Sequence, residues 1–365
     1  MAFDEDGHAR KLRIARWLKP YGISPVTVPS APVFQWKDGK FTADFSDFDR
    51  DVEFLFNECD VNKLFVPKCF ELGGWSKPIR PFLSVPFGID GYDRVFSIAY
   101  REMAEHLRQK GWIDRFIYFI ADEPHESATD TISGIAHVAR MARRIAPEIP
   151  IYCSTWYWMP ELEDALSMWG LGSVGRVVTG EQLAKINAAG VKWMFTVDGQ
   201  INIDTPMNGY ERILGWLSYK YGAAGYEFWG ADWYTFDPWE FGFHRTVEIQ
   251  MDAKHHSRAR FPNGDGYVIY PGRSAGEEPL PSLRLLAARA GIGDYALFQA
   301  LKQTAKPGDA DAAKALKAVC DTVKLPHPMR QSSVFLPDPE RMERCRENAG
   351  CTLDKLLRQR DLSQP

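Results

Sequence analysis

The sequence is poor in cysteine and lacks any long apolar run. It holds six cysteines in 365 residues, and no two of them form a Cys-X-X-Cys pair. So few cysteines exclude a disulfide-built scaffold, and the missing pair argues against structural zinc. No apolar stretch approaches the roughly 20 residues that a membrane-spanning helix needs. We therefore expect no membrane span, no metal and no cofactor.

The chain also lacks an excess of charge of one sign. Lys and Arg number 44 against 48 Asp and Glu, so the net charge is −4 and the pI is about 6.1. This balance offers no basic face for nucleic acid and no polybasic membrane anchor. The acidic N-terminus carries no hydrophobic signal region. We expect a soluble protein that is cytoplasmic, or secreted after processing of a longer chain.

What the sequence does contain is an ordinary globular composition with many aromatic residues. Hydrophobic residues make up 45% and charged residues 25%, which is enough to bury a large core. Aromatic residues reach 13%, with 12 tryptophans. Such residues fill either cores or sugar-stacking clefts, and their number alone does not distinguish the two.

Short apolar segments alternate with amphipathic ones along the first three quarters of the chain. Strands are predicted at Ile23–Val28, Lys63–Lys68, Phe116–Ala121, Ile151–Thr155, Arg176–Val178, Lys192–Val197, Gly225–Trp229 and Tyr267–Tyr270. Helices are predicted at Phe48–Cys59, Tyr92–Lys110, Thr129–Ile145, Glu161–Met168, Glu181–Ala188 and Tyr210–Tyr221. Alternation of this kind implies parallel strands joined by right-handed crossovers. Eight strands favour an α/β fold of the (β/α)8 TIM-barrel type, with an open doubly wound sheet as the competing architecture.

Three further helical segments follow the last predicted strand, at Leu283–Lys302, Asp309–Val323 and Pro337–Leu362. We predict a catalytic barrel over residues 1–305 and a helical extension over residues 306–365 that packs on it. Two glycine patterns, Gly170–Gly175 and Gly272–Gly276, resemble nucleotide-binding and nucleophile-elbow motifs. Neither leads into a helix in the predicted order, so neither predicts a site.

The strongest chemical signal is the acid pair Asp122-Glu123, which follows a buried strand and precedes Pro124. In a parallel barrel the carboxyl ends of the strands form the mouth where active sites lie. Two close carboxylates do not both ionise easily, so one can hold a proton near neutral pH, as a glycosidase requires. The competing interpretation is that the pair caps the helix predicted to begin near Thr129.

Acids and aromatic residues also gather at other predicted strand ends. The acids there are Glu71, Asp198, Glu227 and Asp232. An aromatic ring can stack on the apolar face of a sugar while neighbouring carboxylates bind its hydroxyls. From their positions at strand ends we predict five substrate-binding residues: Trp156, Asp198, Tyr226, Trp229 and Trp233.

Several sequence blocks together resemble glycoside hydrolase family 123 between about Ile23 and Leu301. They are Asp122-Glu-Pro124, Trp229-Gly230, Asp237-Pro-Trp-Glu240, Asn263–Gly272, Pro281-Ser-Leu-Arg-Leu285 and Gly291-Ile-Gly-Asp-Tyr295. The resemblance implies a retaining β-N-acetylgalactosaminidase whose nucleophile is the 2-acetamido oxygen of its own substrate. It implies that Glu123 is the general acid/base and that Asp122 polarises the acetamido N–H. The partner would be a glycan or glycoconjugate with terminal β-linked N-acetylgalactosamine.

The sequence departs from this family in having no room for an N-terminal β-sandwich before Ile23. Three alternatives stay open beside the leading interpretation. One is a β-N-acetylhexosaminidase of broader specificity, since family 20 enzymes also use adjacent Asp and Glu. Another is a conventional two-carboxylate glycosidase with Glu227 as nucleophile. The third is a barrel that binds sugar without turning it over.

Overall fold

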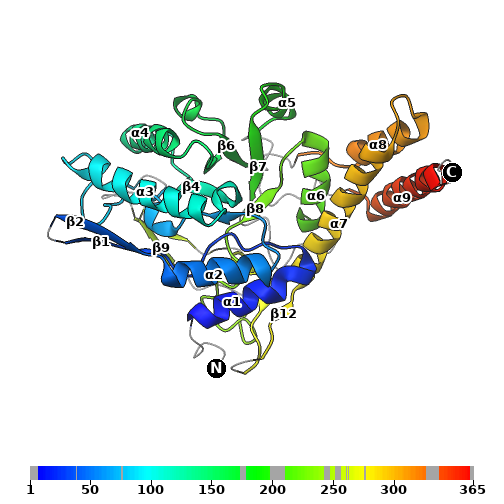
Figure 1. The fold of residues 1–365 in the computed structure, drawn as a ribbon. Helices are drawn as coiled ribbons and strands as arrows, with labels where there is room; N and C mark the ends of the chain where they lie inside the picture. The colour runs from blue at the N-terminus through cyan, green and yellow to red at the C-terminus, as the bar shows by residue number, and fades with distance from the viewer. Residues whose placement is uncertain are drawn as a thin grey trace. The chain divides into compact units, whose positions relative to one another are not determined.

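The computed structural model describes residues 7–37, 39–74, 77–172, 178–197, 210–241, 247–250, 256–259, 261, 263–274, 277–325 and 337–361. The chain divides into two compact units. The first comprises Met1–Gly170, Val247–Ala259 and Gly272–Pro279, and the second comprises Leu171–Thr246, Arg260–Pro271 and Leu280–Pro365. Figure 1 gives the order of the helices and strands along the chain. In these described parts of the chain, no helix has the combined length and apolar character needed to cross a bilayer.

The largest sheet has six strands in the spatial order of the chain. They are β3 (Leu64–Phe65), β4 (Phe116–Asp122), β5 (Ile151–Trp156), β6 (Met168–Gly172), β7 (Lys192–Val197) and β8 (Tyr226–Phe228). The registers of β3 with β4, β4 with β5 and β7 with β8 are parallel. Parallel strands in chain order are the arrangement of a (β/α) barrel. Within the described residues, however, the sheet has six strands, so the predicted closed barrel of eight strands is wrong.

The differences from the predicted strands have physical causes. Segment Ile23–Val28 forms no strand, although the Phe65 amide donates to the Val26 carbonyl at 2.6 Å. This segment contains Pro25, which cannot donate a ladder hydrogen bond. The last expected strand is instead the short β11 (Ile269–Tyr270), which pairs antiparallel with β12 (Leu280–Pro281). Most of the strand expected at 176–178 lies outside the described residues.

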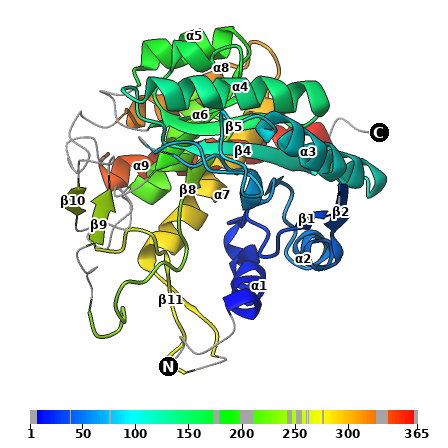
Figure 2. The same ribbon diagram turned by 90° about the vertical axis from the view of Figure 1, so that its left-hand side faces the viewer.

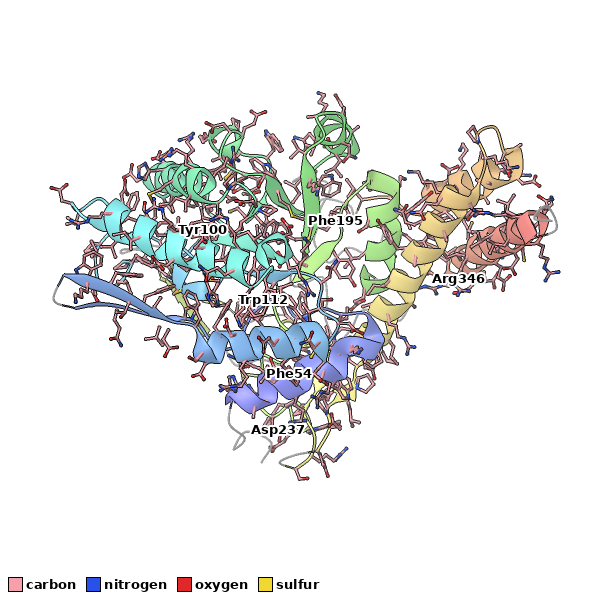
Figure 3. All side chains as sticks on the ribbon, in the orientation of Figure 1. Phe54, Tyr100, Trp112, Phe195, Asp237 and Arg346 are labelled. Atoms are coloured by element: carbon pink, nitrogen blue, oxygen red, sulfur yellow. The ribbon has the colours of Figure 1, made fainter. Side chains whose placement is uncertain are left out.

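In the first unit, β4 has one face toward helices and one toward aromatic neighbours on the adjacent strands. Phe116 packs on Phe48 of α2 (Ser46–Asn57), with 6.0 Å between ring centroids. Tyr118 packs on Tyr100 of α3 (Tyr92–Gln109) at 5.3 Å, and Figure 3 labels Tyr100 on that helix. On the other face, Phe119 stacks with Phe65 of β3 at 5.1 Å. Both faces of the strand are apolar, as expected for a central parallel strand.

The first unit also contains two further helices and two hairpins. They are α1 (Gly7–Leu18), α4 (Thr129–Ile145), the hairpin of β1 (Val33–Lys37) with β2 (Lys40–Asp44), and the hairpin of β9 (Val247–Gln250) with β10 (His256–Ala259). Figure 2 shows β9 beside β10. Helix α1 is tied to α2 by His8, which contacts the buried Asp51 carboxylate at 2.9 Å.

In the second unit, helices α6 (Tyr210–Tyr221) and α7 (Leu283–Thr304) pack at very short range. Glycines make this possible, because a Cβ atom on Gly215 would collide with the Gly291 backbone, and one on Gly291 would collide with Arg212. Next to this crossing, the buried Asp294 accepts hydrogen bonds from Arg212 at 3.0 Å and Trp216 at 2.9 Å. These contacts give a structural reason for Gly291 and for Asp294.

Replacing Gly291 by alanine is expected to lower the unfolding midpoint, because the added methyl group forces α6 and α7 apart. Overpacking of this kind costs about 1–3 kcal/mol. Gly293 is the matched control, since it lies in the same helix with open space around its Cα. Alanine at that position should be neutral or stabilising through helix propensity. Thermal and urea unfolding of both variants measures the effect, and equal midpoints would contradict the packing argument.

Two further helices of the second unit follow α7. They are α8 (Ala310–Thr322) and α9 (Pro339–Asp361), and α5 (Gly180–Ala188) precedes β7 in the same unit. Arg346 of α9, labelled in Figure 3, donates to Asp294 of α7 at 2.7 Å. A single buried carboxylate thus joins α6, α7 and α9. The division into a barrel of 1–305 and an extension of 306–365 stays a prediction.

Candidate active site

The acid pair lies at the end of β4, where an irregularity in the strand redirects its side chains. The register with β5 runs Phe119 with Tyr152, then Ala121 with Cys153, so that β4 has one extra residue at this point. Such a bulge changes the alternation of the strand and re-aims the residues that follow. Asp122 is consequently paired with Ser154, on the same face as Phe119 and Tyr152. The Ser154 hydroxyl donates to the Asp122 carboxylate at 3.1 Å.

Glu123 is turned toward the same strand by its own backbone conformation. Its φ of +43° is left-handed, an uncommon conformation for a residue with a side chain. Its amide donates to the Ser154 carbonyl at 3.0 Å, and its carboxylate accepts a hydrogen bond from the indole of Trp156. Trp156 is also left-handed, with φ of +64°. Two strained residues bonded to each other are typical of a functional site, where surrounding contacts maintain the strain.

Both carboxylates therefore contact the end of β5, Asp122 through Ser154 and Glu123 through Trp156. The structure thus places the two neighbours at one strand end, and their joint action stays a prediction. The bulge in β4 and the left-handed conformation of Glu123 bring the two acids to this position.

A glycine pair after β3 builds the other side of the acid pair. The Asp122 amide donates to the Gly73 carbonyl at 2.9 Å, and Gly74 pairs with Asp122 in a parallel bridge. A Cβ atom on Gly74 would overlap the Asp122 backbone. Only glycine permits this approach, so the Gly73-Gly74 segment continues the ladder of β3 to the level of the acids.

The surroundings of Asp122 have opposite effects on its pKa. The protein atoms packed near this carboxyl raise its pKa by desolvation, although Asp122 as a whole is an exposed residue at the strand end. The Ser154 hydrogen bond and the positive charges of Lys68 and Arg80 act in the opposite direction. Desolvation is the larger effect, so Asp122 has a pKa above the ordinary value for aspartate.

A third carboxylate, Glu71, lies near the pair. Burial raises its pKa, the cations Arg80 and Lys68 lower it, and the charge of Asp122 raises it. Glu71 bonds to Arg80 at 3.2 Å. Sequence reasoning marked Glu71 only as an acid at a strand end and did not mark Arg80 or Ser154. The adjacent glycines at 73 and 74 were the available signal for a close backbone approach here.

Of the predicted substrate-binding residues, Trp156 lies with the acids in the first unit. It is only 5% exposed, and its indole bonds to Glu123. Trp229 and Trp233 belong to the second unit, where their ring centroids are 5.0 Å apart. The Trp229 indole donates to the buried Asp265 at 3.0 Å, while 45% of the residue remains exposed.

The block Asn263–Gly272 positions these rings. The Trp229 ring lies where a Cβ of Gly266 would be, and Gly266 is left-handed with φ of +79°. The Gly266 carbonyl also accepts the Trp233 amide at 3.0 Å. The glycine and aspartate of this block therefore fix an exposed, rigid tryptophan.

The other predicted residues are placed differently or not at all. The Tyr226 hydroxyl is buried, and its pKa is raised by this burial and, to a smaller extent, by the charge of Glu211. Glu227 accepts a hydrogen bond from Thr196 of β7 at 3.1 Å. Asp198 lies outside the described residues. Among the described residues, no group of three or more His, Cys, Asp and Glu side chains could hold a metal ion.

Chemically, the acids provide two carboxyl groups at one strand end, Asp122 held by the Ser154 hydroxyl and Glu123 by the indole N–H of Trp156. A protonated carboxyl can donate to a leaving-group oxygen, and an ionised one can accept from an amide N–H. The pair can therefore serve proton transfer and cation stabilisation at one position.

Comparison with known proteins identifies what the chain is similar to. Residues 26–301 match the family model described as "Glycoside hydrolase 123, catalytic domain". Among curated protein sequences, none is significantly similar. A solved structure of a family 123 glycoside hydrolase from Clostridium perfringens, described in connection with glycolipid glycan hydrolysis, superposes with a TM-score of 0.62 at 13% identity. The match covers 96% of this chain and 64% of that one, so the chain spans less than two thirds of its neighbour.

Proposed function

The chain belongs to glycoside hydrolase family 123, and from that premise we propose that it releases β-linked N-acetylgalactosamine by substrate-assisted catalysis with retention of configuration. The finer part of this proposal rests on the adjacency of Asp122 and Glu123. The observation that carries it is that both carboxylates bond to the same end of β5, through Ser154 and Trp156.

Adjacent acids suit a substrate that supplies its own nucleophile. A protein nucleophile must attack from the face of the sugar opposite the acid, with the two carboxyl groups about 5 Å apart across the glycosidic bond. Asp122 and Glu123 are chain neighbours held against one strand. When the 2-acetamido oxygen attacks the anomeric carbon, the second carboxylate belongs beside the acetamido group, and a neighbour of the acid can occupy that place.

In the first step, Glu123 donates its proton to the glycosidic oxygen as the bond from that oxygen to the anomeric carbon breaks. The acetamido oxygen forms a bond to the same carbon and produces an oxazolinium ion. Asp122 accepts a hydrogen bond from the acetamido N–H and stabilises the positive charge that develops there. Trp156 orients Glu123 through its indole N–H.

In the second step, Glu123 is a carboxylate and removes a proton from water. The water oxygen attacks the anomeric carbon from the face that the aglycone left, and the bond to the acetamido oxygen breaks. The sugar leaves with its original configuration, and Glu123 regains its proton. We further propose that the exposed Trp229 and its neighbour Trp233 provide a stacking surface for sugar, while Asp198 and Tyr226 remain predicted contacts.

An aryl N-acetyl-β-galactosaminide is expected to be hydrolysed, and the matching aryl β-galactoside, which lacks the acetamido group, is not. The reason is that the second compound has no internal nucleophile. Release of the aryl alcohol from both compounds, and from the gluco-configured N-acetyl analogue, measures this directly. Equal rates on the two galactosides would contradict substrate assistance. Equal rates on the two N-acetyl compounds would indicate broader hexosaminidase specificity.

A further inference from the structure

Beside the acid pair lies an ion pair that the mechanism above does not use. Glu71 and Arg80 bond at 3.2 Å, and their environments differ sharply. The Glu71 side chain is 11% exposed, whereas that of Arg80 is 59% exposed. The carboxylate is thus enclosed at the site, while much of the guanidinium faces solvent and can meet a ligand.

Backbone contacts fix the segment that follows Glu71 against the end of β4. The Leu72 amide donates to the Ile120 carbonyl at 2.8 Å, and the Leu72 carbonyl accepts the Arg80 amide at 2.9 Å. The aliphatic part of the Arg80 side chain lies over Gly73, whose carbonyl accepts the Asp122 amide. Glu71, Arg80 and Asp122 are therefore held by one hydrogen-bonded strand pair, and the charge of Asp122 acts on Glu71.

The pair offers an acceptor and a donor side by side. A carboxylate only accepts hydrogen bonds and a guanidinium only donates them. Two neighbouring hydroxyl groups of a sugar ring each donate one hydrogen bond and accept another, so they match this arrangement. Because the Glu71 carboxylate is enclosed, a change of either partner can affect stability as well as binding, so the two effects are measured separately.

We propose that Glu71 and Arg80 bind two adjacent hydroxyl groups of the sugar whose acetamido group is held by Asp122, and so contribute to substrate specificity. This inference rests on the proposed function of the acid pair. It assigns Glu71 as hydroxyl acceptor and Arg80 as hydroxyl donor. Neither residue takes part in proton transfer.

The test combines protein variants with deoxy substrates. Hydrolysis of aryl N-acetyl-β-galactosaminide and of its 3-deoxy and 4-deoxy analogues is measured for the wild-type protein, Glu71→Gln, Arg80→Met and Arg80→Lys. Glu148→Gln is the matched control, because Glu148 forms an exposed ion pair with Arg108 at 2.9 Å elsewhere in the same unit. Unfolding midpoints of all variants show whether each is folded.

For the wild type, loss of a bound hydroxyl is expected to lower kcat/KM about 10- to 100-fold, the usual effect of a hydrogen bond to a charged group. On the complete sugar, Glu71→Gln and Arg80→Met should each have a kcat/KM lower than that of the wild type by a similar factor. Removing the contacted hydroxyl from the substrate as well should lower the kcat/KM of these variants little further. Arg80→Lys should retain part of the activity, and Glu148→Gln should match the wild type.

Two results would overturn the inference. If removing a hydroxyl from the substrate lowers kcat/KM by the same factor in the wild type and in the variants, the pair does not contact the hydroxyls. The proposed function of the acid pair still stands in that case. If the wild-type protein hydrolyses no N-acetylhexosaminide, the proposed function fails and the inference fails with it. If Glu71→Gln does not fold, the result with Arg80→Met decides whether the pair binds the hydroxyls, because the mostly exposed side chain of Arg80 can be replaced without loss of the fold.

Discussion

Glu123→Gln is expected to lower kcat/KM on an N-acetylgalactosaminide with a poor leaving group by about 10²- to 10⁴-fold. General acid catalysis by a positioned side chain has this magnitude. Glutamine keeps the size of the side chain and can still accept the hydrogen bond from Trp156, but it has no acidic proton to transfer to the leaving group. Steady-state hydrolysis of an alkyl glycoside measures the loss.

The leaving group provides the internal check. An activated aryl group such as dinitrophenolate departs without protonation, so the first step should slow much less in Glu123→Gln than it does with the alkyl glycoside. Glu126→Gln is the control for charge, because Glu126 is an exposed acid three residues further along the chain. A loss that is independent of the leaving group would remove Glu123 from the role of acid.

The strands that sequence reasoning located are those with strong local signals. Phe116–Ala121, Ile151–Thr155 and Lys192–Val197 are apolar runs bounded by polar or turn residues, and the structure places β4, β5 and β7 there. The segment Glu161–Met168 was predicted to be helical, but the structure has a single 3₁₀ turn at Pro160–Leu162 followed by β6.

Strand β6 was missed for a physical reason. Its sequence Met168-Trp-Gly-Leu-Gly172 contains two glycines, which have low strand propensity, and it is buried along its whole length. A strand buried on both faces has no polar alternation that a pattern could detect. Burial is decided by the elements that cover it, and these come from distant parts of the chain.

The residues of the candidate site likewise include some that the sequence could indicate and some that it could not. Asp122 and Glu123 could be found because a buried run, two acids and a proline are contiguous. Ser154 could not be found, and Glu71 could be marked only as an acid at a strand end, because their approach to the pair depends on the register between strands and on the bulge in β4. A one-residue change in register moves every following side chain to the other face, and sequence alone does not specify it.

Asp122→Asn is expected to lower kcat/KM by roughly 10²- to 10³-fold, the effect of removing one preorganised electrostatic partner of the transition state. Asparagine keeps the shape and the contact with Ser154 but carries no negative charge opposite the oxazolinium ion. Glu227→Gln is the comparison variant. In a conventional two-carboxylate enzyme with Glu227 as nucleophile, the order would reverse, and Glu227→Gln would be the more severe change.

The pH profile tests the same assignment independently. In the proposed mechanism Asp122 works as the ionised carboxylate, so activity should fall as the pH drops through its pKa. Because desolvation raises that pKa, this acidic limb should lie above the pH expected for an ordinary aspartate. The positive charge of Arg80 lowers the pKa of Asp122, so the Arg80→Met variant should have its acidic limb at still higher pH. This shift should be larger at low ionic strength, because much of Arg80 is exposed and its charge is screened by salt. Asp122→Asn should abolish the limb, and a limb that persists unchanged in that variant would belong to another group.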